Sequence, residues 1–422
     1  MVKRNFHYII ILFIELLLFI SLITFVSYFF NITLLMLFKE HLPFLYTLLF
    51  IFTTALILIS FTYFLMKIRN FSKQSMINIL LLNVALIISF CCVELILRKS
   101  GINATWAETS KHAYLSSYRY WESTLYHEWP SNSVINIHLP EYDLARKANS
   151  LGLCDIEHPV AKDSNEFRII GIGDSFTEGS GAHTDSTWLK FLERSIKTYC
   201  PAKLRFMNAG LSGSDPFFEY ILLRDKLLRY KPNLVILTIN FTDINDILVK
   251  GGMERFKPDG TLNHRRGPCW EWVYALSYTL RLIIHNVFQY NIDLMSPEVY
   301  NKEFLRSKNQ LKQSLLLFDS LAKNNHFMLL IVLHPSLAEL NDKKYINLYD
   351  ICNFASDNHI PCFDMLDYFI KKEHITAKSS HEYYWKYDPH HNAKGYAAFA
   401  RGVGWKLTQM GIIDSINNQM HE

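Results

Sequence analysis

Long apolar runs dominate the first hundred residues of the chain, at positions 8–30, 44–66 and 77–97. Each run reaches the length of about 20 residues that a helix needs to cross the hydrocarbon core of a bilayer. The first run is too long for the apolar part of a cleaved signal peptide, and no small-residue cleavage site follows it. We therefore expect residues 1–99 to form a membrane anchor of three transmembrane helices.

Beyond residue 165 the spacing changes, and short β-branched runs alternate with stretches of helical periodicity. The runs typical of strands are 168–173, 203–208, 234–239, 327–333 and 360–363. The helical stretches are 186–199, 216–230, 302–323, 344–357 and 393–410. This alternation predicts a parallel sheet covered by helices on both faces, with functional groups at the carboxyl ends of the strands.

Two segments lack a clear period. Residues 100–165, rich in Tyr, Trp, Asn and Ser, form a loosely patterned lead-in to the predicted sheet. Residues 250–298 contain Gly, Pro, His and aromatic residues without regular spacing, and we interpret them as an insertion or lid. The folded domain is then residues 166–422, interrupted by that insertion.

Positive charges beside the apolar runs predict the orientation of the anchor. The positive-inside rule places the N-terminus and the loop between the second and third runs in the cytoplasm. The basic residues that indicate this are Lys3, Arg4, Lys67, Arg69 and Lys73, and they outnumber Arg98 and Lys99, which favour the opposite orientation. Everything after residue 97 is therefore expected to be extracytoplasmic. Glu94, inside the third run, is expected to snorkel to the interface or to be protonated.

Composition and charge narrow the chemistry. The chain of 422 residues has a formal net charge of +4 without a long basic tract, so nucleic acid is not an expected partner. Its 7 cysteines include no C-x-x-C pair, which argues against a zinc or iron–sulfur site. Cys352 and Cys362 lie close enough in sequence to form a disulfide in an oxidising compartment.

The first predicted strand ends in the segment Gly-Asp-Ser-Phe-Thr-Glu-Gly, residues 173–179. Ser175 then lies at a strand-to-helix turn, where free backbone N–H groups and the helix dipole favour a developing negative charge. A dinucleotide-binding fingerprint would need glycine in place of Phe176. The nucleophile elbow of α/β-hydrolases would need glycine in place of Thr177. Ser175 is therefore a candidate nucleophile outside both of those patterns.

A second cluster of polar residues lies near the C-terminus, in the segment Asp-Pro-His-His-Asn of residues 388–392. Serine is a poor nucleophile at neutral pH until a neighbouring base accepts its proton, and that base must be oriented. Asp388 and His390 together supply an orienting carboxylate and a base. His391 is the competing base, because the same segment also spells Asp-x-x-His.

Together these segments resemble the conserved blocks of the SGNH/GDSL hydrolase family. Residues 173–179 look like its first block, Asn-Ala-Gly at 208–210 looks like its second, and 388–396 looks like its last, in the family's order. The resemblance covers about residues 166 to 412. It implies a flavodoxin-like α/β/α sandwich of three layers for that part of the chain.

The resemblance also implies a division of labour among these residues. Ser175 would be the nucleophile, His390 the general base, and Asp388 the residue that fixes the histidine tautomer. The backbone N–H groups of Ser175 and Gly210 would stabilise the oxyanion.

The third block of the family departs from its pattern here. The family has Gly-x-Asn-Asp after the third strand, and its asparagine donates to the oxyanion. In this chain Asn240 stands in place of the glycine and Thr242 in place of the asparagine. Either side chain, or neither, completes the oxyanion hole. The loss of one such donor typically raises the barrier by about 2.7–4 kcal/mol, so weak or altered activity is one consequence.

These features predict a membrane-anchored serine esterase that forms an acyl-serine intermediate and uses no cofactor and no metal. Its expected substrates, by resemblance, are O-acyl and above all O-acetyl esters of cell-envelope carbohydrate, outside the membrane in the bacterial periplasm or at the cell exterior. One alternative is an O-acyltransferase that modifies an envelope glycan and draws its acyl group from a separate membrane protein. A second is a non-catalytic glycan-binding or assembly protein, which is disfavoured if His390 lies within hydrogen-bond reach of Ser175 and Asp388.

Overall fold

The computed structural model describes residues 72–100, 128–198, 203–258, 277–291 and 293–418, with single positions at 64, 262, 268 and 274. The chain divides into two units. The first consists of Met1–His112 and Gly267–Pro297, and the second of Ala113–Arg266 and Glu298–Glu422. The predicted spans at 8–30 and 44–66, with the basic residues at positions 3, 4, 67 and 69, lie outside the described residues.

In the first unit the described helices are α4 (Lys73–Ser100) and α12 (Tyr278–Asn286). Helix α4 contains the third predicted apolar run. Across the described stretches of the chain, no helix combines the length and the apolar character needed to span a membrane. The second half of the predicted insertion, residues 267–297, belongs to this first unit, and its interpretation as a lid stays a prediction.

Glu94 links the two helices of the first unit. Its side chain is buried, and its carboxylate accepts hydrogen bonds of 2.9 Å from the N–H groups of Tyr278 and Thr279. The hydroxyls of Ser277 and Thr279 donate to the same carboxylate, also at 2.9 Å. A carboxylate at this position satisfies N–H groups that the first turn of a helix leaves without partners. The expectation that Glu94 snorkels to an interface is therefore wrong, because it caps α12 instead.

The second unit contains a parallel sheet of five strands in the order β4-β3-β5-β6-β7. Its strands are β3 (Glu166–Gly173), β4 (Lys203–Gly210), β5 (Leu234–Ile239), β6 (Met328–Leu333) and β7 (Cys362–Asp364). In chain order this is 2-1-3-4-5, the strand order of flavodoxin-like sheets. The predicted strands are confirmed, with β7 shorter and shifted toward the C-terminus.

The remaining described helices lie between these strands or after the last of them. They are α7 (Ser175–Glu178), α8 (Trp188–Lys197), α9 (Pro216–Leu222), α10 (Asp243–Lys250), α13 (Pro297–Asn325), α14 (Leu337–Asp342), α15 (Ile351–Asp357), α16 (Met365–Lys371), α17 (Ala393–Gln409) and α18 (Ile412–Asn418). Short turns of other helix types are η2 (Thr184–Ser186), η3 (Leu223–Leu227), η4 (Leu228–Tyr230), η5 (Gly252–Arg255) and η6 (Ser380–Glu382). The single helix predicted at 216–230 is thus α9, continued by a π-helical and a 3₁₀ turn.

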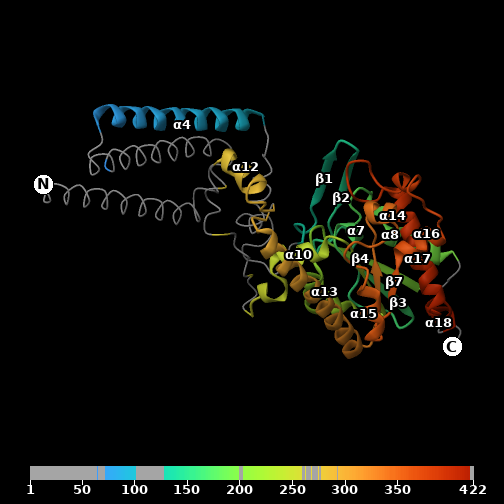
Figure 1. Ribbon diagram of the computed structural model, residues 1–422. Helices are drawn as coiled ribbons and strands as arrows, with labels where there is room; N and C mark the ends of the chain where they lie inside the picture. Colours follow the sequence, from blue (N-terminus) through green and yellow to red (C-terminus); the bar gives the residue numbers. More distant parts are fainter. Residues whose placement is uncertain are drawn as a thin grey trace. The chain divides into compact units, whose positions relative to one another are not determined.

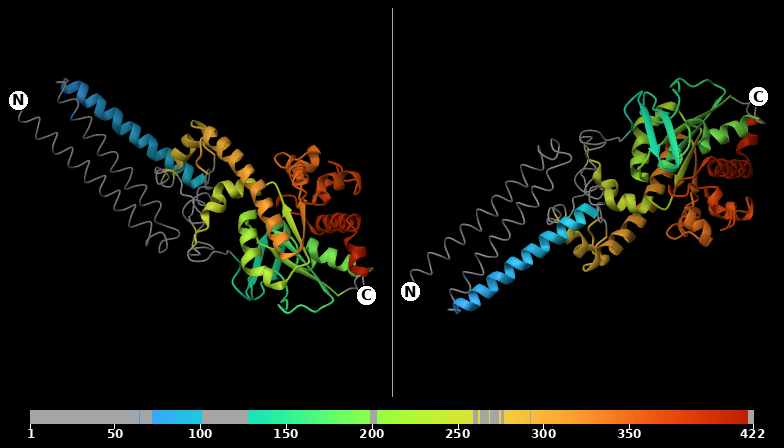
Figure 2. Two further views of the ribbon diagram at one scale, coloured as in Figure 1. Left: turned by 90° about the horizontal axis from the view of Figure 1, so that it is seen from below. Right: turned by 90° about the horizontal axis from the view of Figure 1, so that it is seen from above.

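Helices cover both faces of the sheet in the second unit (Figures 1 and 2). Every residue of β3 and β5 is buried, as expected for strands between two layers of helices. On one face Trp188 of α8 packs against Phe399 of α17, with ring centroids 5.4 Å apart. On the other face Tyr220 of α9 packs against Phe318 of α13 at 5.8 Å. The predicted α/β architecture is confirmed.

Part of the lead-in is more regular than its sequence indicated. Residues Val134–Leu139 (β1) and Tyr142–Lys147 (β2) form an antiparallel hairpin, which is a two-stranded sheet separate from the main one. Only alternate residues of β2 face the domain, and they are Tyr142, Leu144 and Arg146. The rest of the hairpin is largely exposed, so its strands carry a weak apolar signal.

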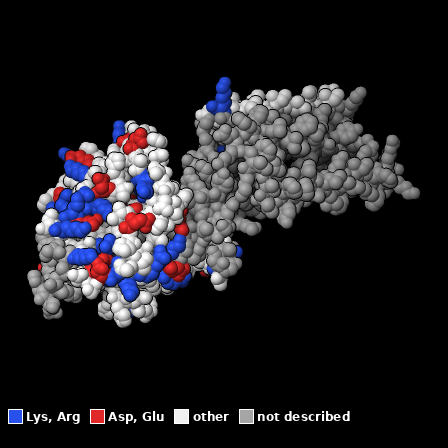
Figure 3. Space-filling view, turned by 180° about the vertical axis from the view of Figure 1, so that it is seen from behind, with Lys and Arg blue, Asp and Glu red and all other residues white. Residues whose placement is uncertain are grey.

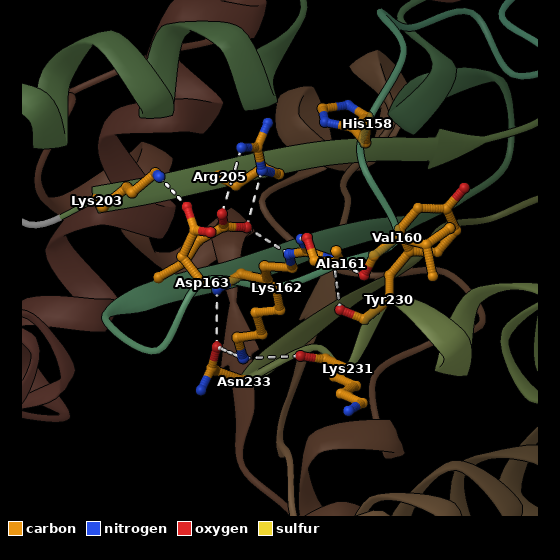
Figure 4. Close-up of polar contacts among 12 residues, drawn as sticks. His158, Val160, Ala161, Lys162, Asp163, Lys203, Arg205, Tyr230, Lys231 and Asn233 are labelled. Atoms are coloured by element: carbon orange, nitrogen blue, oxygen red, sulfur yellow. Dashed lines mark hydrogen bonds and ion pairs between the residues drawn. The ribbon is translucent and has the colours of Figure 1, made fainter.

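Arg168, near the start of β3, fastens the end of the sheet opposite the strand carboxyl ends. Figure 4 shows its partners Val160, Ala161 and Tyr230. This fully buried guanidinium donates to the carbonyls of Val160 (3.1 Å), Ala161 (2.6 Å) and Tyr230 (2.8 Å). It also pairs with Glu166, which accepts a second hydrogen bond from Arg205 at 2.8 Å. These contacts attach the end of the lead-in to the base of the sheet.

A disulfide joins Cys352 of α15 to Cys362 of β7, with a Cα–Cα distance of 5.4 Å. This confirms the predicted pairing. On the face drawn in Figure 3, Lys and Arg side chains are interspersed with Asp and Glu.

Candidate active site

The structure brings the predicted nucleophile and base together. The Ser175 hydroxyl and His390 Nε2 are 2.7 Å apart, although 215 positions separate the two residues in the chain. Ser175 is the first residue of α7, directly after β3, and His390 lies on the loop before α17. Helix α7 is only a single turn that ends at Gly179, so little of the predicted helix dipole acts on Ser175.

Asp388 is the third member of this group, and Ser175, His390 and Asp388 together form the candidate triad. Its Oδ1 lies 2.5 Å from His390 Nδ1 and also accepts the backbone N–H of His390 at 2.9 Å. Its Oδ2 accepts a hydrogen bond of 2.5 Å from the Tyr142 hydroxyl. Burial alone would raise the pKa of Asp388, but the donors on His390 and Tyr142 outweigh it and lower the pKa to about 2. Asp388 is therefore ionised at neutral pH and selects the His390 tautomer with its proton on Nδ1.

His391, the competing base, is directed away from Ser175. Its ring is fully buried, and Nδ1 bonds the carbonyl of Tyr383 at 2.9 Å. The ring packs against those of Tyr384 and His334, with centroids 4.1 Å and 4.7 Å away. Burial lowers the pKa of His391 to about 3. His390 is thus the only one of the two adjacent histidines that contacts the serine.

The buried neutral state of His391 predicts a pH-dependent contribution to stability. Because the folded pKa of about 3 lies below the ordinary value of 6.5, the unfolded chain binds a proton first as the pH falls. As the pH falls from 7 to 5, the contribution of His391 to the unfolding free energy of the wild-type chain should therefore decrease by about 2 kcal/mol. Urea unfolding at both pH values should show the advantage of wild type over His391→Phe shrinking by that amount. An advantage that stays constant across this range would contradict the assignment.

Gly210, predicted to supply an oxyanion donor, has a different role. Its N–H donates to the side-chain oxygen of Asn208 at 3.0 Å. A Cβ on Gly210 would lie 2.0 Å from the backbone nitrogen of Glu178 and 2.4 Å from the carbonyl carbon of Thr177. The glycine is thus required because β4 passes directly against the turn that carries Ser175. The predicted oxyanion role of Gly210 does not fit this geometry.

Gly210→Ala is therefore expected to act on stability. Backbone atoms of α7 cannot rotate away as a side chain can, so the overpacked methyl group should cost about 1–3 kcal/mol or more. Urea unfolding of the variant measures this loss, with Gly404→Ala as the control, because a Cβ on Gly404 would meet only Leu192 Cδ1 at 3.3 Å. A Gly210→Ala protein as stable as wild type would contradict the packing role.

Asn240 and Thr242, the alternatives for the remaining donor, both lie beside Asp174, the residue before the nucleophile. Asn240 donates from Nδ2 to Asp174 Oδ2 at 2.6 Å and is buried. The Thr242 hydroxyl lies 2.8 Å from Asn240 Oδ1 and 3.4 Å from Asp174 Oδ2. Both groups therefore have acceptors within the chain, and the choice between them stays open.

Gly213 is a further candidate donor. It has a φ of 75°, its Cα is exposed, and no atom lies within 4 Å of where a Cβ would be. Its neighbours contact the turn around Ser175: Leu211 N–H donates to Gly173 O at 3.0 Å, and Ser214 Oγ to the same oxygen at 3.2 Å. Within the described residues the Gly213 N–H makes no hydrogen bond. Sequence reasoning missed it, although Ser-Gly-Ser-Asp at 212–215 is a turn signal.

His334 is fully buried directly after β6, where its ring packs against Phe176 at 4.3 Å and Phe399 at 4.6 Å. Burial lowers the pKa of His334 well below its usual range. It is a packing residue behind the site.

The sequence matches no protein-family model, and no curated protein is significantly similar to it. Solved structures that overlap with it include an acetylxylan esterase from Geobacillus stearothermophilus, at 13% identity and a TM-score of 0.36, covering 58% of this chain and 94% of the other. A lipase/acylhydrolase from Enterococcus faecalis overlaps at 11% identity and a TM-score of 0.34, covering 58% and 96%. A GDSL-like lipase from Bacteroides thetaiotaomicron overlaps at 14% identity and a TM-score of 0.32, covering 58% and 88%. These identities and TM-scores are too low to transfer a function to this chain.

Proposed function

We propose that this chain is a membrane-anchored serine esterase of the SGNH/GDSL type that works through an acyl-serine intermediate. The observation that carries the proposal is the continuous chain of hydrogen bonds from Ser175 through His390 to Asp388. A serine, a base within hydrogen-bond reach and an orienting carboxylate are the parts that nucleophilic acyl transfer requires. The same geometry disfavours a non-catalytic binding protein, which needs no such chain.

The reaction follows from these positions. His390 Nε2 accepts the hydroxyl proton while Ser175 Oγ attacks the carbonyl carbon of the ester and forms a tetrahedral oxyanion. Collapse of this intermediate breaks the bond to the alcohol, which leaves with the proton from His390. A water molecule then attacks the acyl-serine by the same route, and the products are a carboxylic acid and the free enzyme.

The proposed oxyanion hole consists of the N–H groups of Ser175 and Gly213. Ser175 begins α7, so its N–H has no acceptor within the helix. Gly213 is exposed next to that turn, and its carbonyl is fixed by Lys250 Nζ. A third donor requires either that the Thr242 hydroxyl turns away from Asn240 Oδ1, 2.8 Å away, or that the Asn240 amide leaves Asp174 Oδ2, 2.6 Å away.

The proposed substrates are O-acyl esters, above all O-acetyl esters, of envelope carbohydrate. This class is suggested by the family that the motifs resemble. The proposed location is outside the membrane, as the positive-inside rule predicts from the first hundred residues. The Cys352–Cys362 disulfide supports an oxidising compartment such as the periplasm or the cell exterior.

The test is turnover by the full-length chain in mild detergent, first with p-nitrophenyl acetate and then with an O-acetylated oligosaccharide. An esterase releases acetate from both in the absence of any acceptor. If acetate appears only as a new ester on an added glycan acceptor, the protein is the O-acyltransferase of the alternative prediction. A folded protein inactive in both assays would overturn the proposal.

A further inference from the structure

The β1–β2 hairpin is fastened to the domain at its base. A two-stranded hairpin is marginally stable by itself, and this one has no hydrogen-bonded neighbour in the main sheet. Arg146 in β2 is 2% exposed and donates from Nε to the carbonyl of Ala182 at 3.2 Å. Its guanidinium also bonds the carbonyl of Gly179 and lies 3.6 Å from the Glu178 carboxylate. The base of the hairpin is thus attached to the turn that follows Ser175.

The tip of the hairpin contacts the loop that carries the other two triad residues. Glu141, in the turn between β1 and β2, accepts hydrogen bonds from three consecutive backbone N–H groups. They belong to Lys386 (2.7 Å), Tyr387 (2.8 Å) and Asp388 (2.8 Å). Successive N–H groups that converge on one carboxylate form an anion nest, which fixes the direction of each peptide plane. Glu141 therefore determines how the backbone enters Asp388.

Tyr142, the next residue, contacts the triad itself. Its hydroxyl donates to Asp388 Oδ2, the oxygen that His390 does not use. Its ring lies 5.1 Å from that of Trp385, whose indole N–H donates to the carbonyl of Gly181 at 3.0 Å. The Asp388 carboxylate is thus bound on one side by the hairpin and on the other by the imidazole.

We infer that the hairpin is a positioning element for Asp388 and His390. Glu141 fixes the backbone of their loop, and Tyr142 orients the Asp388 carboxylate. This inference rests on the proposed esterase function. Neither residue touches the reacting atoms, so both act through Asp388 and His390. A hairpin that only stabilised the fold would need no polar contact with a triad carboxylate.

The Tyr142 contact has a consequence for the pH profile. A donated hydrogen bond withdraws negative charge from Asp388, and its removal should strengthen the attraction between the carboxylate and the His390 imidazolium. In Tyr142→Phe the acidic limb of kcat/KM is therefore expected to move to higher pH by about 0.5 unit. The titratable groups facing His390 and Asp388 otherwise stay the same: Glu141, Asp174, His334 and His391.

The Glu141 contact should affect turnover. A glutamine at 141 keeps one acceptor oxygen, but its NH₂ group faces backbone N–H groups of the loop. Because two donors cannot form a hydrogen bond, the loop must shift. A displacement of catalytic groups by about 1 Å can cost on the order of 100-fold, and we expect Glu141→Gln to lower kcat by about 10- to 100-fold. KM for p-nitrophenyl acetate should change little, because this small ester makes few contacts with the loop.

The experiment measures kcat, KM and the pH profile of the full-length chain for wild type, Glu141→Gln and Tyr142→Phe, with urea unfolding of each protein. Asp143→Asn is the matched control for the carboxylate, since Asp143 lies in β2, two residues after Glu141, with a side chain 75% exposed. Tyr349→Phe, at a tyrosine that is 67% exposed, is the control for the lost hydroxyl. Ser175→Ala reports the background rate.

A raised acidic limb in Tyr142→Phe and a kcat loss in stably folded Glu141→Gln, with both controls like wild type, would support the inference. If both variants match an active wild type, or lose activity only in proportion to their unfolded fraction, the hairpin is a structural element and the inference fails. A failure of the proposed function looks different. In that case wild type itself turns over no faster than Ser175→Ala, and both proposals are overturned.

Discussion

Ser175→Ala should abolish ester hydrolysis, with kcat/KM for p-nitrophenyl acetate falling by about 10⁴-fold or more. The methyl group cannot attack the carbonyl carbon, and among the described residues no other hydroxyl bonds His390 Nε2. The hydrogen bond of 2.7 Å is the contact that this substitution removes. Steady-state kinetics of the full-length chain, with folding checked by urea unfolding, measures the loss.

Ser180→Ala is the matched control. Ser180 follows the same turn, but in the part of the chain that the structure describes its hydroxyl pairs with Ser212 alone, at 3.3 Å. Activity close to wild type is expected from this variant. If Ser175→Ala kept more than a few per cent of the activity, the nucleophile would have to be another group.

The second large effect is expected from Asp388→Asn, which should lower kcat by about 10⁴-fold, as for the corresponding change in well-studied serine hydrolases. The two carboxylate oxygens accept from opposite sides, His390 on Oδ1 and Tyr142 on Oδ2. An asparagine side chain can accept a hydrogen bond through its oxygen from only one of these two donors, because its other group is an NH₂. With its NH₂ toward His390 it selects the tautomer protonated on Nε2, which cannot accept the proton of Ser175.

With its NH₂ toward Tyr142, the asparagine keeps the tautomer but no longer provides the charge that stabilises the imidazolium. The expected loss therefore does not depend on which orientation the amide takes. Asp143→Asn serves as the control, because its carboxylate contacts His138 at 2.8 Å and no triad residue. If Asp388→Asn were nearly as active as wild type, His390 would need a different orienting group.

The architecture and the triad were accessible from the sequence because both produce local signals. A buried parallel strand is a continuous apolar run, and β3, β5 and β6 appear as such runs. A residue with a reactive side chain directly after such a run lies at the carboxyl end of a strand, where functional groups of a parallel sheet gather. This position identified Ser175 from the local sequence alone, and the Asp-x-His spacing identified Asp388 and His390.

The oxyanion donors were harder to predict because they are backbone groups. Gly210 is the last residue of β4 and Gly213 lies in the loop after it, and the sequence does not reveal which N–H is already bonded. The structure distinguishes them through Asn208, whose side chain accepts the Gly210 N–H. The need for glycine at 210 comes from close packing, which only three-dimensional distances reveal.

The hairpin and the partner of Glu94 were missed for a related reason. Strand β2 has only three inward-facing positions, and one of them is Arg146, so the strand carries little apolar signal. Its importance comes from contacts across the chain: Glu141 meets residues about 245 positions away. Glu94 likewise meets Ser277 across 183 positions. Neither contact leaves a local signal in the sequence, whereas the pairing of Ser175 with His390 was indicated by the family that the motifs resemble.

Covalent labelling is the most direct test of whether Ser175 is the nucleophile. The full-length chain would be treated with a serine-reactive fluorophosphonate, digested, and analysed by mass spectrometry to locate the adduct. One adduct is expected, on Ser175, that is lost in Ser175→Ala and forms much more slowly in His390→Ala. A folded protein that gives no adduct, or carries it on Ser180 or Ser212 instead, would contradict the assignment of Ser175 as the nucleophile.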